Sequence, residues 1–365
     1  MTQKVRVGVV GTSWWADMMF LPALQTHPHA VLTAVCGRNR ERAEELARKY
    51  GIPDVFTDYR EMIERGGLDA LIVAVPDDLH YDITMKALAA GLHVLCEKPL
   101  AMTAQEAWEM CQRAEAAKVK TMVLFTYRWM PFLRYLRDLI DQGYIGRFYQ
   151  CEFRWQTGLG RDDPTNWRFD RHRANGILGD LGSHLIDLAL WLVGDINRVS
   201  GQLGVFIDRP EQEVAGFELA NDSAHLLVGF ANGAHGLIQA STGAPIGDRW
   251  MQQQINLYGS AGTLELNAIY RGAEAGVVVR GARSDDEHFH VLEVPASYWG
   301  DANWSDPFGF FATQPVGSRS FIDAIVADRP ITPDFYDGFK VQQVIDAALL
   351  SHESGCAVNV AKPTT

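Results

Sequence analysis

The sequence lacks the cysteine pattern of a zinc site or a disulfide framework. Its five cysteines are odd in number and scattered, and none belongs to a Cys-x-x-Cys pair: Cys36, Cys96, Cys111, Cys151 and Cys356. Structural zinc sites and redox motifs use closely spaced pairs, and disulfide frameworks usually hold an even number of cysteines. We therefore expect reduced thiols, no metal site and a cytoplasmic location.

Long apolar runs and an excess of positive charge are also missing. The longest apolar runs, Leu68–Pro76 and Leu185–Gly194, are far shorter than the ~20 residues that cross a bilayer. The N-terminal residues enter an apolar run at once, without the apolar region of a signal peptide. The formal net charge is −12, whereas proteins that bind nucleic-acid phosphates are usually basic. The sequence thus predicts neither a membrane nor a nucleic-acid partner.

What is present is ordinary globular composition, arranged in two patterns. The 365 residues are 47% hydrophobic and 21% charged, which suffices for two domains. In the first part, predicted strands over residues 5–10, 31–36, 69–75, 93–96 and 121–125 alternate with predicted helices over 14–24, 40–50, 80–90 and 103–118. Apolar strands that alternate with helices indicate parallel βαβ units. We predict a doubly wound, Rossmann-type dinucleotide-binding domain over residues 1–126.

After residue 126, strands follow one another through short turns rich in Gly, Asn and Asp. The predicted strands are 148–155, 199–207, 223–230, 236–242, 252–258, 262–266, 276–280 and 288–294. Predicted helices lie near 131–142, 183–193, 318–328 and 335–354. We expect an α+β domain over residues 127–365, with an open, mainly antiparallel sheet. Apolar residues in its later strands, such as Ile255, Leu257, Leu264, Leu266 and 277–279, suggest a face that a homodimer or homotetramer would cover.

The turn after the first strand resembles the dinucleotide-binding fingerprint G-x-G-x-x-G/A. Gly11 occupies the first position and Ala16 is an allowed residue at the third. Ser13 replaces the second glycine, so its side chain crowds the approach of a phosphate while offering a hydroxyl. Trp14 and Trp15 lie inside the motif and are predicted to bind the cofactor with it. An ordinary strand–helix turn is the alternative, which the surrounding βαβ pattern disfavours.

The end of the second strand bears on the choice of cofactor. Most NAD-binding domains have an acidic residue there that binds the ribose 2′-hydroxyl, but this sequence has Gly37 followed by Arg38 and Arg40. A carboxylate would repel a 2′-phosphate, whereas glycine leaves space and arginine supplies the opposite charge. We predict NADP, with NAD as the alternative. The arginines could also be a solvated helix start.

Two short motifs contain candidate catalytic residues. Glu97-Lys98-Pro99 follows a strand, at the edge where α/β sites lie, and its lysine could bind a substrate hydroxyl; a surface turn is the alternative. On a predicted helix, Asp180, His184 and Asp187 are spaced i, i+4 and i+7 and would share one face. A histidine between carboxylates is suited to general-base catalysis, although a core histidine would show the same pattern.

These motifs together resemble the Gfo/Idh/MocA family of glucose–fructose oxidoreductase and inositol dehydrogenase. The resemblance runs through Arg6–Gly11, Ala70–Val75 with Pro76 and His80, Ala87–Pro99, Gly179–Asp187 and Gly259–Leu264. It implies that Lys98 binds the reacting hydroxyl and that Asp180 and His184 form an aspartate–histidine pair in which His184 accepts the proton. Pro76, His80 and Glu97 are expected at the cofactor. Ser13 and Gly37 depart from the usual family pattern.

Aromatic and charged residues around these motifs are candidates for binding substrate. They are Tyr127, Arg128, Trp155, Trp167, Arg168 and Asp187, with Asp170 and Arg171 nearby. Aromatic faces beside Arg and Asp suit polyhydroxylated rings, because the C–H face stacks while the hydroxyls form hydrogen bonds. Trp155 and Trp167 could instead be core residues. A sugar- or cyclitol-like substrate is the prediction.

The leading prediction is therefore an NAD(P)-dependent oxidoreductase of a secondary alcohol or ketone on a sugar-like ring. One alternative is an NAD-dependent glycosidase on the same fold, which oxidises its substrate only transiently and gives no net cofactor reduction. The other is a non-catalytic, NADP-sensing regulator. A regulator would have no need of Lys98, Asp180 and His184, so their presence favours an enzyme.

Overall fold

The computed structural model describes residues 4–158, 160–161, 165–209 and 216–361. Its internal contacts divide the chain into two compact units, residues 1–125 with 300–340 and residues 126–299 with 341–365. The predicted boundary after residue 126 falls beside the first division. Residues 300–340, which sequence order assigns to the second domain, instead pack with the first unit.

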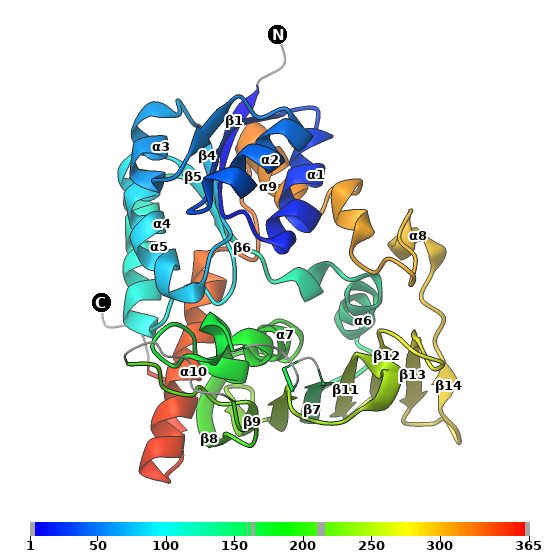
Figure 1. The fold of residues 1–365 in the computed structure, drawn as a ribbon. Helices are drawn as coiled ribbons and strands as arrows, with labels where there is room; N and C mark the ends of the chain where they lie inside the picture. Colours follow the sequence, from blue (N-terminus) through cyan, green and yellow to red (C-terminus); the bar gives the residue numbers. More distant parts are fainter. Residues whose placement is uncertain (1–3, 159, 162–164, 210–215, 362–365) are drawn as a thin grey trace. The chain divides into compact units, whose positions relative to one another are not determined.

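The first unit contains a six-stranded parallel sheet with the order β3-β2-β1-β4-β5-β6 (Figure 1). Its strands are β1 (Val5–Val10), β2 (Ala30–Cys36), β3 (Asp54–Phe56), β4 (Ala70–Val73), β5 (His93–Cys96) and β6 (Thr121–Val123). This order is that of a doubly wound dinucleotide-binding fold, so the predicted fold class is confirmed. The sequence analysis missed β3, a three-residue strand without a buried residue.

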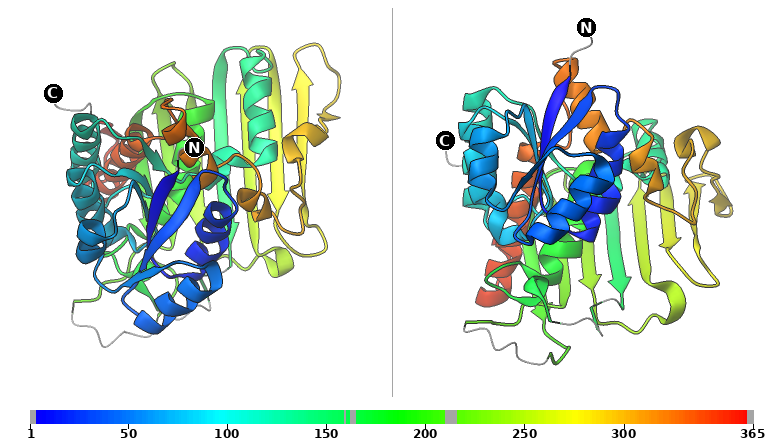
Figure 2. Two further views of the ribbon diagram at one scale, coloured as in Figure 1. Left: turned by 90° about the horizontal axis from the view of Figure 1, so that it is seen from above. Right: turned by 45° about the horizontal axis from the view of Figure 1, so that its top comes forward.

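Helices flank both faces of this sheet (Figures 1 and 2). They are η1 (Ala16–Phe20), α1 (Leu21–Gln25), α2 (Arg40–Tyr50), α3 (Tyr59–Arg65), η2 (Asp77–Leu79), α4 (His80–Ala89), α5 (Ala104–Ala117), η7 (Gly309–Ala312) and α9 (Ser318–Val326). Helix α5 begins with a capping box: Thr103 accepts a hydrogen bond from the Glu106 amide, and the Glu106 carboxylate accepts one from the Met102 amide. Gly51 ends α2 with a φ of 68°, in the left-handed region that favours glycine.

Helix α9 explains why residues 300–340 belong to the first unit. Its buried residues, including Phe321 and Ile322, form an apolar face. Arg319 donates hydrogen bonds to the Ala23 carbonyl (2.8 Å) and the Thr26 hydroxyl (2.9 Å), and His27 Nε2 lies 3.2 Å from Asp323 Oδ1. These bonds attach α9 to α1, an attachment that sequence order does not indicate.

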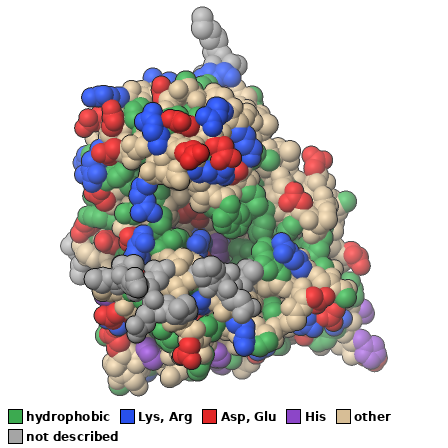
Figure 3. Space-filling model, in the orientation of Figure 1, with side chains coloured by type: hydrophobic (Ala, Val, Ile, Leu, Met, Phe, Trp, Pro, Cys, Tyr) green, Lys and Arg blue, Asp and Glu red, His purple; other side chains and the backbone are tan. Residues whose placement is uncertain are grey.

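Acidic and basic side chains intermingle on the surface of the first unit seen in Figure 3. Ion pairs such as Lys49–Asp17 and Arg60–Asp82 account for part of this arrangement. In the described part of the chain, no helix has the length and hydrophobicity to cross a membrane. The described residues also contain no group of three or more His, Cys, Asp or Glu side chains placed to hold a metal ion.

The second unit contains a nine-stranded sheet with the order β14-β13-β12-β11-β7-β10-β9-β8-β15 (Figure 1). Its strands are β7 (Phe148–Thr157), β8 (Ile196–Gly204), β9 (Ser223–Phe230), β10 (His235–Ser241), β11 (Met251–Gly259), β12 (Gly262–Ile269), β13 (Gly276–Arg283), β14 (His290–Val291) and β15 (Val358–Asn359). All neighbours are antiparallel except β7 and β10. The predicted open, mainly antiparallel sheet is confirmed.

The remaining helical segments belong wholly or mostly to this unit. They are η3 (Thr126–Trp129), α6 (Pro131–Asp141), η4 (Trp167–Phe169), η5 (Leu178–Gly182), α7 (Ser183–Leu192), η6 (Gly247–Arg249), α8 (Ala296–Trp299) and α10 (Phe335–Ser354), which crosses the division between the units. Helix α10 lies against β8, where the Ser351 hydroxyl accepts a hydrogen bond from the Gly201 amide (2.9 Å). A Cβ at Gly201 would lie 2.7 Å from the Ala348 carbonyl oxygen, so this approach requires glycine.

Alternation along the strands separates a buried face of the second sheet from a more accessible one. In β11 and β12 the apolar residues Ile255, Leu257, Leu264 and Leu266 are all buried, and so is Val279 in β13. Of the residues expected to form an uncovered face, Val278 is 40% exposed, whereas these five are covered within the single chain. They point to the buried face because the strand period of two places them all on one side.

Candidate active site

Gly11 shapes the turn at the end of β1. Its φ is +122°, and a Cβ there would lie 2.0 Å from the Ala74 carbonyl oxygen. Only glycine fits this conformation and this close approach. The Gly11 amide donates to the Cys36 carbonyl at the end of β2 (2.9 Å). The turn therefore lies where the strand order reverses, which is where doubly wound sheets bind dinucleotides.

The residues after Gly11 open a helix. Ser13 Oγ accepts a long hydrogen bond from the Ala16 amide (3.4 Å), so the hydroxyl that replaces the second glycine points toward the helix start. Ala16 is fully buried, as the third fingerprint position requires, whereas Trp14 is exposed. Trp15 Nε1 donates to Glu97 Oε1 at 2.5 Å and so links this turn to the Glu-Lys-Pro motif.

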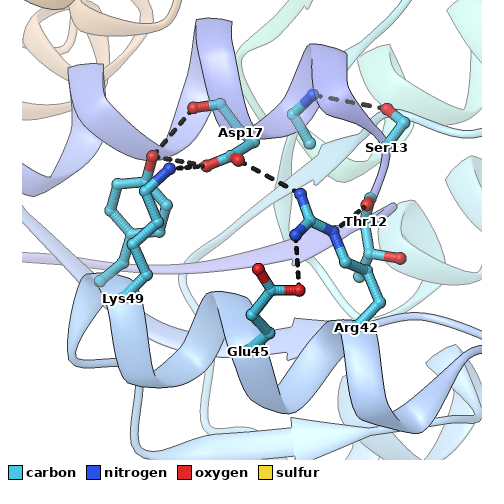
Figure 4. A network of polar contacts seen from close by, with 8 residues as sticks. Thr12, Ser13, Asp17, Arg42, Glu45 and Lys49 are labelled. Atoms are coloured by element: carbon cyan, nitrogen blue, oxygen red, sulfur yellow. Dashed lines mark hydrogen bonds and ion pairs between the residues drawn. The ribbon is translucent and has the colours of Figure 1, made fainter.

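Asp17 fastens this helix to α2 (Figure 4). Its carboxylate accepts hydrogen bonds from Lys49 Nζ (2.7 Å), the Tyr50 hydroxyl (2.7 Å) and Arg42 Nη2 (3.2 Å). Arg42 Nε also donates to the Thr12 carbonyl at 3.5 Å. Burial alone would raise the pKa of Asp17, but the hydrogen bonds and positive charges around it outweigh burial and lower the pKa. The network thus holds the turn after β1 and the following helix against α2.

We expect Asp17→Asn to destabilise the protein in a pH-dependent way. Because the Asp17 pKa is lower in the folded chain than in the unfolded chain, its stabilisation is present at neutral pH and is lost as pH falls through the folded value. The variant should lose about 1–2 kcal/mol of unfolding free energy at pH 7 and much less near pH 3. Urea unfolding at both pH values measures this difference. Glu45→Gln removes an exposed neighbouring carboxylate and should change little; an equal loss at both pH values for Asp17→Asn would contradict the assignment.

Gly37 lies directly against the cofactor turn. A Cβ at this position would lie 2.5 Å from Thr12 Cγ2 and 2.7 Å from its hydroxyl oxygen. The Thr12 side chain thus occupies the space from which an acidic residue at position 37 would extend. Arg40 Nε donates to Glu44 Oε1 (2.9 Å), whereas exposed Arg38 forms no ion pair with another described residue. Of the two predicted arginines, Arg38 is therefore the one without an ion-pair partner within the described ranges.

The buried side chain of His80 contacts the backbone of the Glu-Lys-Pro motif. Its side chain is fully buried, with Nδ1 2.8 Å from the Pro99 carbonyl and Nε2 3.0 Å from the Val75 carbonyl. Burial lowers the pKa of His80, against the raising effect of the two carbonyl groups. His80 therefore joins two backbone segments at the ends of β4 and β5. Both ring nitrogens contact backbone carbonyls, so His80 acts as a positioning residue. The sequence had predicted a contact with the cofactor instead.

Glu97 and Lys98 lie just after β5. Glu97 is buried and accepts hydrogen bonds from Trp15 Nε1 and, at 3.3 Å, from the Lys98 amide. Lys98 and Pro76 are half-buried, and the Lys98–Pro99 peptide bond is cis. The first unit thus links Trp15, in the turn after β1, to Glu97. That these residues bind a cofactor stays a prediction.

In the second unit, His184 at the start of α7 is packed among aromatic rings. Its ring centroid lies 4.8 Å from that of Tyr127 and 5.8 Å from that of Trp155, and Tyr127 meets Trp155 edge-on at 4.5 Å. All three side chains are at least nine-tenths buried. Tyr127 follows β6 and Trp155 lies on β7, so three separate elements form this cluster. A histidine so placed has a fixed ring position and little contact with water.

Asp180 lies one turn before His184, in the π-helical segment η5 rather than in an α-helix. The predicted helical spacing is therefore altered, because a π-helix has more residues per turn; such segments are frequent at functional sites. Arg168 Nε lies 3.9 Å from Asp180 Oδ2, and the Arg168 guanidinium lies over the Trp167 ring at 4.4 Å. Asp180, Arg168 and Trp167 thus form one group, as the sequence suggested.

Asp187 and Arg128, predicted respectively to orient His184 and to bind substrate, are partners of each other in the structure. Both side chains are buried and pair with each other: Arg128 Nη2 lies 2.6 Å from Asp187 Oδ1, and Arg128 Nε lies 2.9 Å from Oδ2. This bidentate pair ties η3 to α7 and places Tyr127 beside His184. Spacing along one helix cannot reveal it, because Arg128 comes from another element.

Asp170 and Arg171 also have structural partners. Asp170 Oδ1 accepts a hydrogen bond from the His172 amide (3.0 Å), and Arg171 pairs with Glu218 at 2.8 Å. Sequence reasoning missed Tyr270, a buried residue that follows β12 and lies beside Tyr127. Burial, together with this contact and the negative charge of Asp180, raises the pKa of Tyr127 well above its usual value. Tyr127 therefore stays a neutral phenol at neutral pH.

Comparison with known proteins agrees with this architecture. Residues 5–125 match a model described as an oxidoreductase family with an NAD-binding Rossmann fold, and residues 133–265 match the GFO/IDH/MocA C-terminal domain. Levoglucosan dehydrogenase of Pseudarthrobacter phenanthrenivorans is 28% identical over 381 residues, covering 96% of each chain. D-Glucoside 3-dehydrogenase of Escherichia coli is 32% identical over 53% of this chain and 55% of its own.

Solved structures show the same likeness over the whole chain. Levoglucosan dehydrogenase in complex with NADH and levoglucosan has a TM-score of 0.87 at 27% identity, covering 99% of this chain and all of the other. An oxidoreductase domain protein from Kribbella flavida has a TM-score of 0.87 at 29% identity, with the same coverage. Both domain models come from one family and match in the order found here. The resemblance seen in the sequence is confirmed, and the chain is an oxidoreductase of the Gfo/Idh/MocA family.

Proposed function

We propose that the protein oxidises a secondary alcohol on a sugar- or cyclitol-like ring, or reduces the matching ketone, with a nicotinamide dinucleotide. The observation that carries this proposal is the placement of His184 among Tyr127 and Trp155, one turn after Asp180. Aromatic faces beside polar groups suit a polyhydroxylated ring. Several relatives are named as sugar dehydrogenases, which supports the same substrate class.

Each candidate residue has a distinct proposed task. His184 accepts the hydroxyl proton, because an imidazole gains and loses protons near neutral pH. Asp180 either fixes the imidazole or binds a substrate hydroxyl. Lys98 stabilises the developing alkoxide through its positive charge. When bound, the nicotinamide supplies the hydride acceptor or donor. Gly11, Ser13, Trp15 and Ala16, in the turn and helix start after β1, would hold its dinucleotide.

A panel of sugars and cyclitols tests this function. The probes are levoglucosan, methyl β-D-glucoside, D-glucose, D-xylose and myo-inositol, each with NAD⁺ and with NADP⁺, followed at the nicotinamide absorbance. Net reduction of the cofactor with a ring polyol supports the dehydrogenase. Cleavage of the glucoside without net reduction would instead support the glycosidase alternative.

We further propose that NADP(H) binds more tightly than NAD(H). The support is the glycine at position 37, where Thr12 excludes an acidic side chain, and the exposed guanidinium of Arg38. One arginine–phosphate contact contributes ~1.5–3 kcal/mol, which corresponds to a preference of about tenfold or more. Arg38→Ala should reduce this preference, and Arg40→Ala should reduce it less because Arg40 pairs with Glu44. Titration of both cofactors measures the ratio; equal or tighter NAD(H) binding by the unmodified protein would refute the preference.

We also propose that the protein forms a homodimer or homotetramer through the accessible face of the second sheet. Leu227 and Leu237 are cross-strand partners on this face, and each is about half exposed (53% and 51%). Multi-angle light scattering should give two or four times the 40.6 kDa of one chain. Leu237→Lys should shift the distribution toward the monomer, since a charge on this face opposes association. A single 40.6 kDa species at micromolar concentration for the unmodified chain would exclude this assembly.

A further inference from the structure

The carboxylate of Glu97 joins two segments of the first unit that are far apart in sequence. Its Oε1 accepts a hydrogen bond from the indole Nε1 of Trp15, 82 positions earlier, at 2.5 Å. Its other oxygen, Oε2, accepts a hydrogen bond from the backbone amide of Lys98 at 3.3 Å. The Glu97 side chain therefore connects an aromatic residue of the turn after β1 with the backbone of the lysine that is proposed to stabilise the alkoxide.

Burial makes this connection strong. Glu97 is only 7% exposed, so its carboxylate has lost most of its contact with water and depends on hydrogen bonds from the protein. Bonds to a charged acceptor are shorter and stronger than bonds between neutral groups. The contact with the Trp15 indole is shorter than the contact with the Lys98 amide. The indole N–H therefore has a large part in fixing where the carboxylate lies.

Aromatic neighbours hold the Trp15 ring in turn. Trp14 and Phe308 both meet it edge-on, with ring centroids 5.4 and 6.0 Å away and interplanar angles of 80° and 73°. Phe308 belongs to the segment 300–340 that packs with the first unit. Edge-on contacts between aromatic rings favour a defined ring orientation. The direction of the indole N–H is thus set by residues from two separate parts of the chain.

Main-chain contacts fix the backbone on both sides of Lys98. The Glu97 amide donates a hydrogen bond to the Val73 carbonyl of β4 at 2.9 Å. The Pro99 carbonyl lies 2.8 Å from His80 Nδ1. Between these attachments, the Lys98 amide contacts the Glu97 carboxylate. Loss of the indole bond would free the carboxylate, and with it the peptide from which the lysine side chain extends.

We propose that Trp15 is a positioning residue for Lys98: its indole N–H holds the Glu97 carboxylate, which holds the backbone amide of the lysine. This inference rests on the proposed function, in which the Lys98 ammonium stabilises the developing alkoxide. That ammonium must lie within hydrogen-bond reach of the reacting oxygen, and a displacement of about 1 Å can lower a rate ~10²-fold. A residue of the turn after β1 thereby helps to place the group that acts on the substrate.

The test is Trp15→Phe, which keeps an aromatic ring but removes the N–H. For a verified ring polyol, kcat at saturating cofactor should fall at least about tenfold, while the substrate KM should stay within about threefold. Saturation keeps any change in cofactor affinity out of kcat. Trp108→Phe is the matched control, because Trp108 is a half-buried tryptophan of α5 that packs against Phe339, with 5.0 Å between ring centroids. It should keep kcat within about twofold.

A double-mutant cycle with Glu97→Met separates positioning through Glu97 from simple packing. Methionine has a similar length but no carboxylate. In the Glu97→Met background, Trp15→Phe should lower kcat by less than about twofold further, because the group through which the indole acts is gone. An equal fall in both backgrounds would overturn the proposal, since Trp15 would then act by packing alone. An unchanged kcat for Trp15→Phe by itself would also overturn it.

Labelling of lysines tests the same link without any enzyme reaction. Brief treatment with acetic anhydride, followed by mass spectrometry, gives the labelling rate of Lys98 relative to Lys86, a surface lysine of α4. Lys98 is half-buried, so a loosened backbone should raise this ratio at least about twofold in Trp15→Phe but not in Trp108→Phe. Glu97→Met removes the link from its other end and should raise the ratio as well, so the result does not depend on the folding of one variant.

Failure of the proposed function gives a different result. In that case the unmodified protein reduces neither NAD⁺ nor NADP⁺ with any sugar of the panel, and no kcat can be compared. The labelling ratio then decides the link separately. A raised ratio in Trp15→Phe and in Glu97→Met would support it, whereas an unchanged ratio in both would overturn it.

Discussion

Replacing His184 by alanine is expected to lower kcat by ~10²–10⁴, the range that a positioned general base contributes. A secondary alcohol loses hydride readily only as its hydroxyl proton is removed, and the imidazole of His184 is held for that task by Tyr127 and Trp155. Affinity for the cofactor should stay within a few fold, because the predicted cofactor contacts all lie in the first unit. Steady-state kinetics on a verified substrate, with cofactor titration, measure both quantities.

His172→Ala is the matched control, since His172 is an exposed histidine of the same unit that pairs with Glu218. It should keep kcat within about twofold. If His184→Ala instead keeps nearly full kcat, the proposed base is wrong, and Tyr127 or a water molecule becomes the candidate. Burial and its neighbours raise the pKa of the Tyr127 phenol, which makes Tyr127 the weaker proton acceptor at neutral pH.

The same kinetics test the positive charge of Lys98. Lys98→Ala should also lower kcat by ~10²–10⁴, because the alkoxide loses its electrostatic stabilisation. Lys98→Arg should not restore activity, since a planar guanidinium differs in shape from a compact ammonium group. Lys86→Ala, on the surface of α4 and paired with Asp82, should be neutral. Full activity of Lys98→Arg would show that charge alone suffices at this position.

Local sequence signals predicted the features that depend on neighbouring residues. Gly11 and Ala16 could be assigned because a tight turn and a close helix–strand approach restrict residue type at fixed spacing. Thr103 and Glu106 likewise have the fixed spacing of a capping box, and they mark the start of the helix predicted over residues 103–118. The alternation of buried strands with helices predicted the parallel sheet, and short turns predicted the antiparallel one.

Features that depend on contacts between distant segments could not be predicted in this way. Asp187 shares a helix with His184, but its partner Arg128 lies 59 positions away, so helical spacing could not indicate the pair. The packing of residues 300–340 on the first unit is equally invisible in sequence order.

Breaking the Arg128–Asp187 pair is expected to have the largest effect on stability. Both side chains are buried, and the guanidinium binds the carboxylate through two nitrogens. Asp187→Ala would remove the carboxylate that balances this buried guanidinium, which costs about 3–5 kcal/mol of unfolding free energy. Arg65→Ala, which removes an exposed pair with Glu61, should cost far less as an i,i+4 surface interaction. Urea unfolding of the two variants measures this contrast.

The double variant Arg128→Met with Asp187→Leu separates a structural pair from a catalytic one. It removes both charges at once, so it should recover most of the stability that Asp187→Ala loses, because the desolvation cost of the ions is removed with them. If the pair only positions Tyr127 and α7, the folded double variant should keep kcat within about fivefold. A restored unfolding free energy combined with a ~10²-fold fall in kcat would show instead that Asp187 acts on His184 in the reaction, as the helical spacing first suggested.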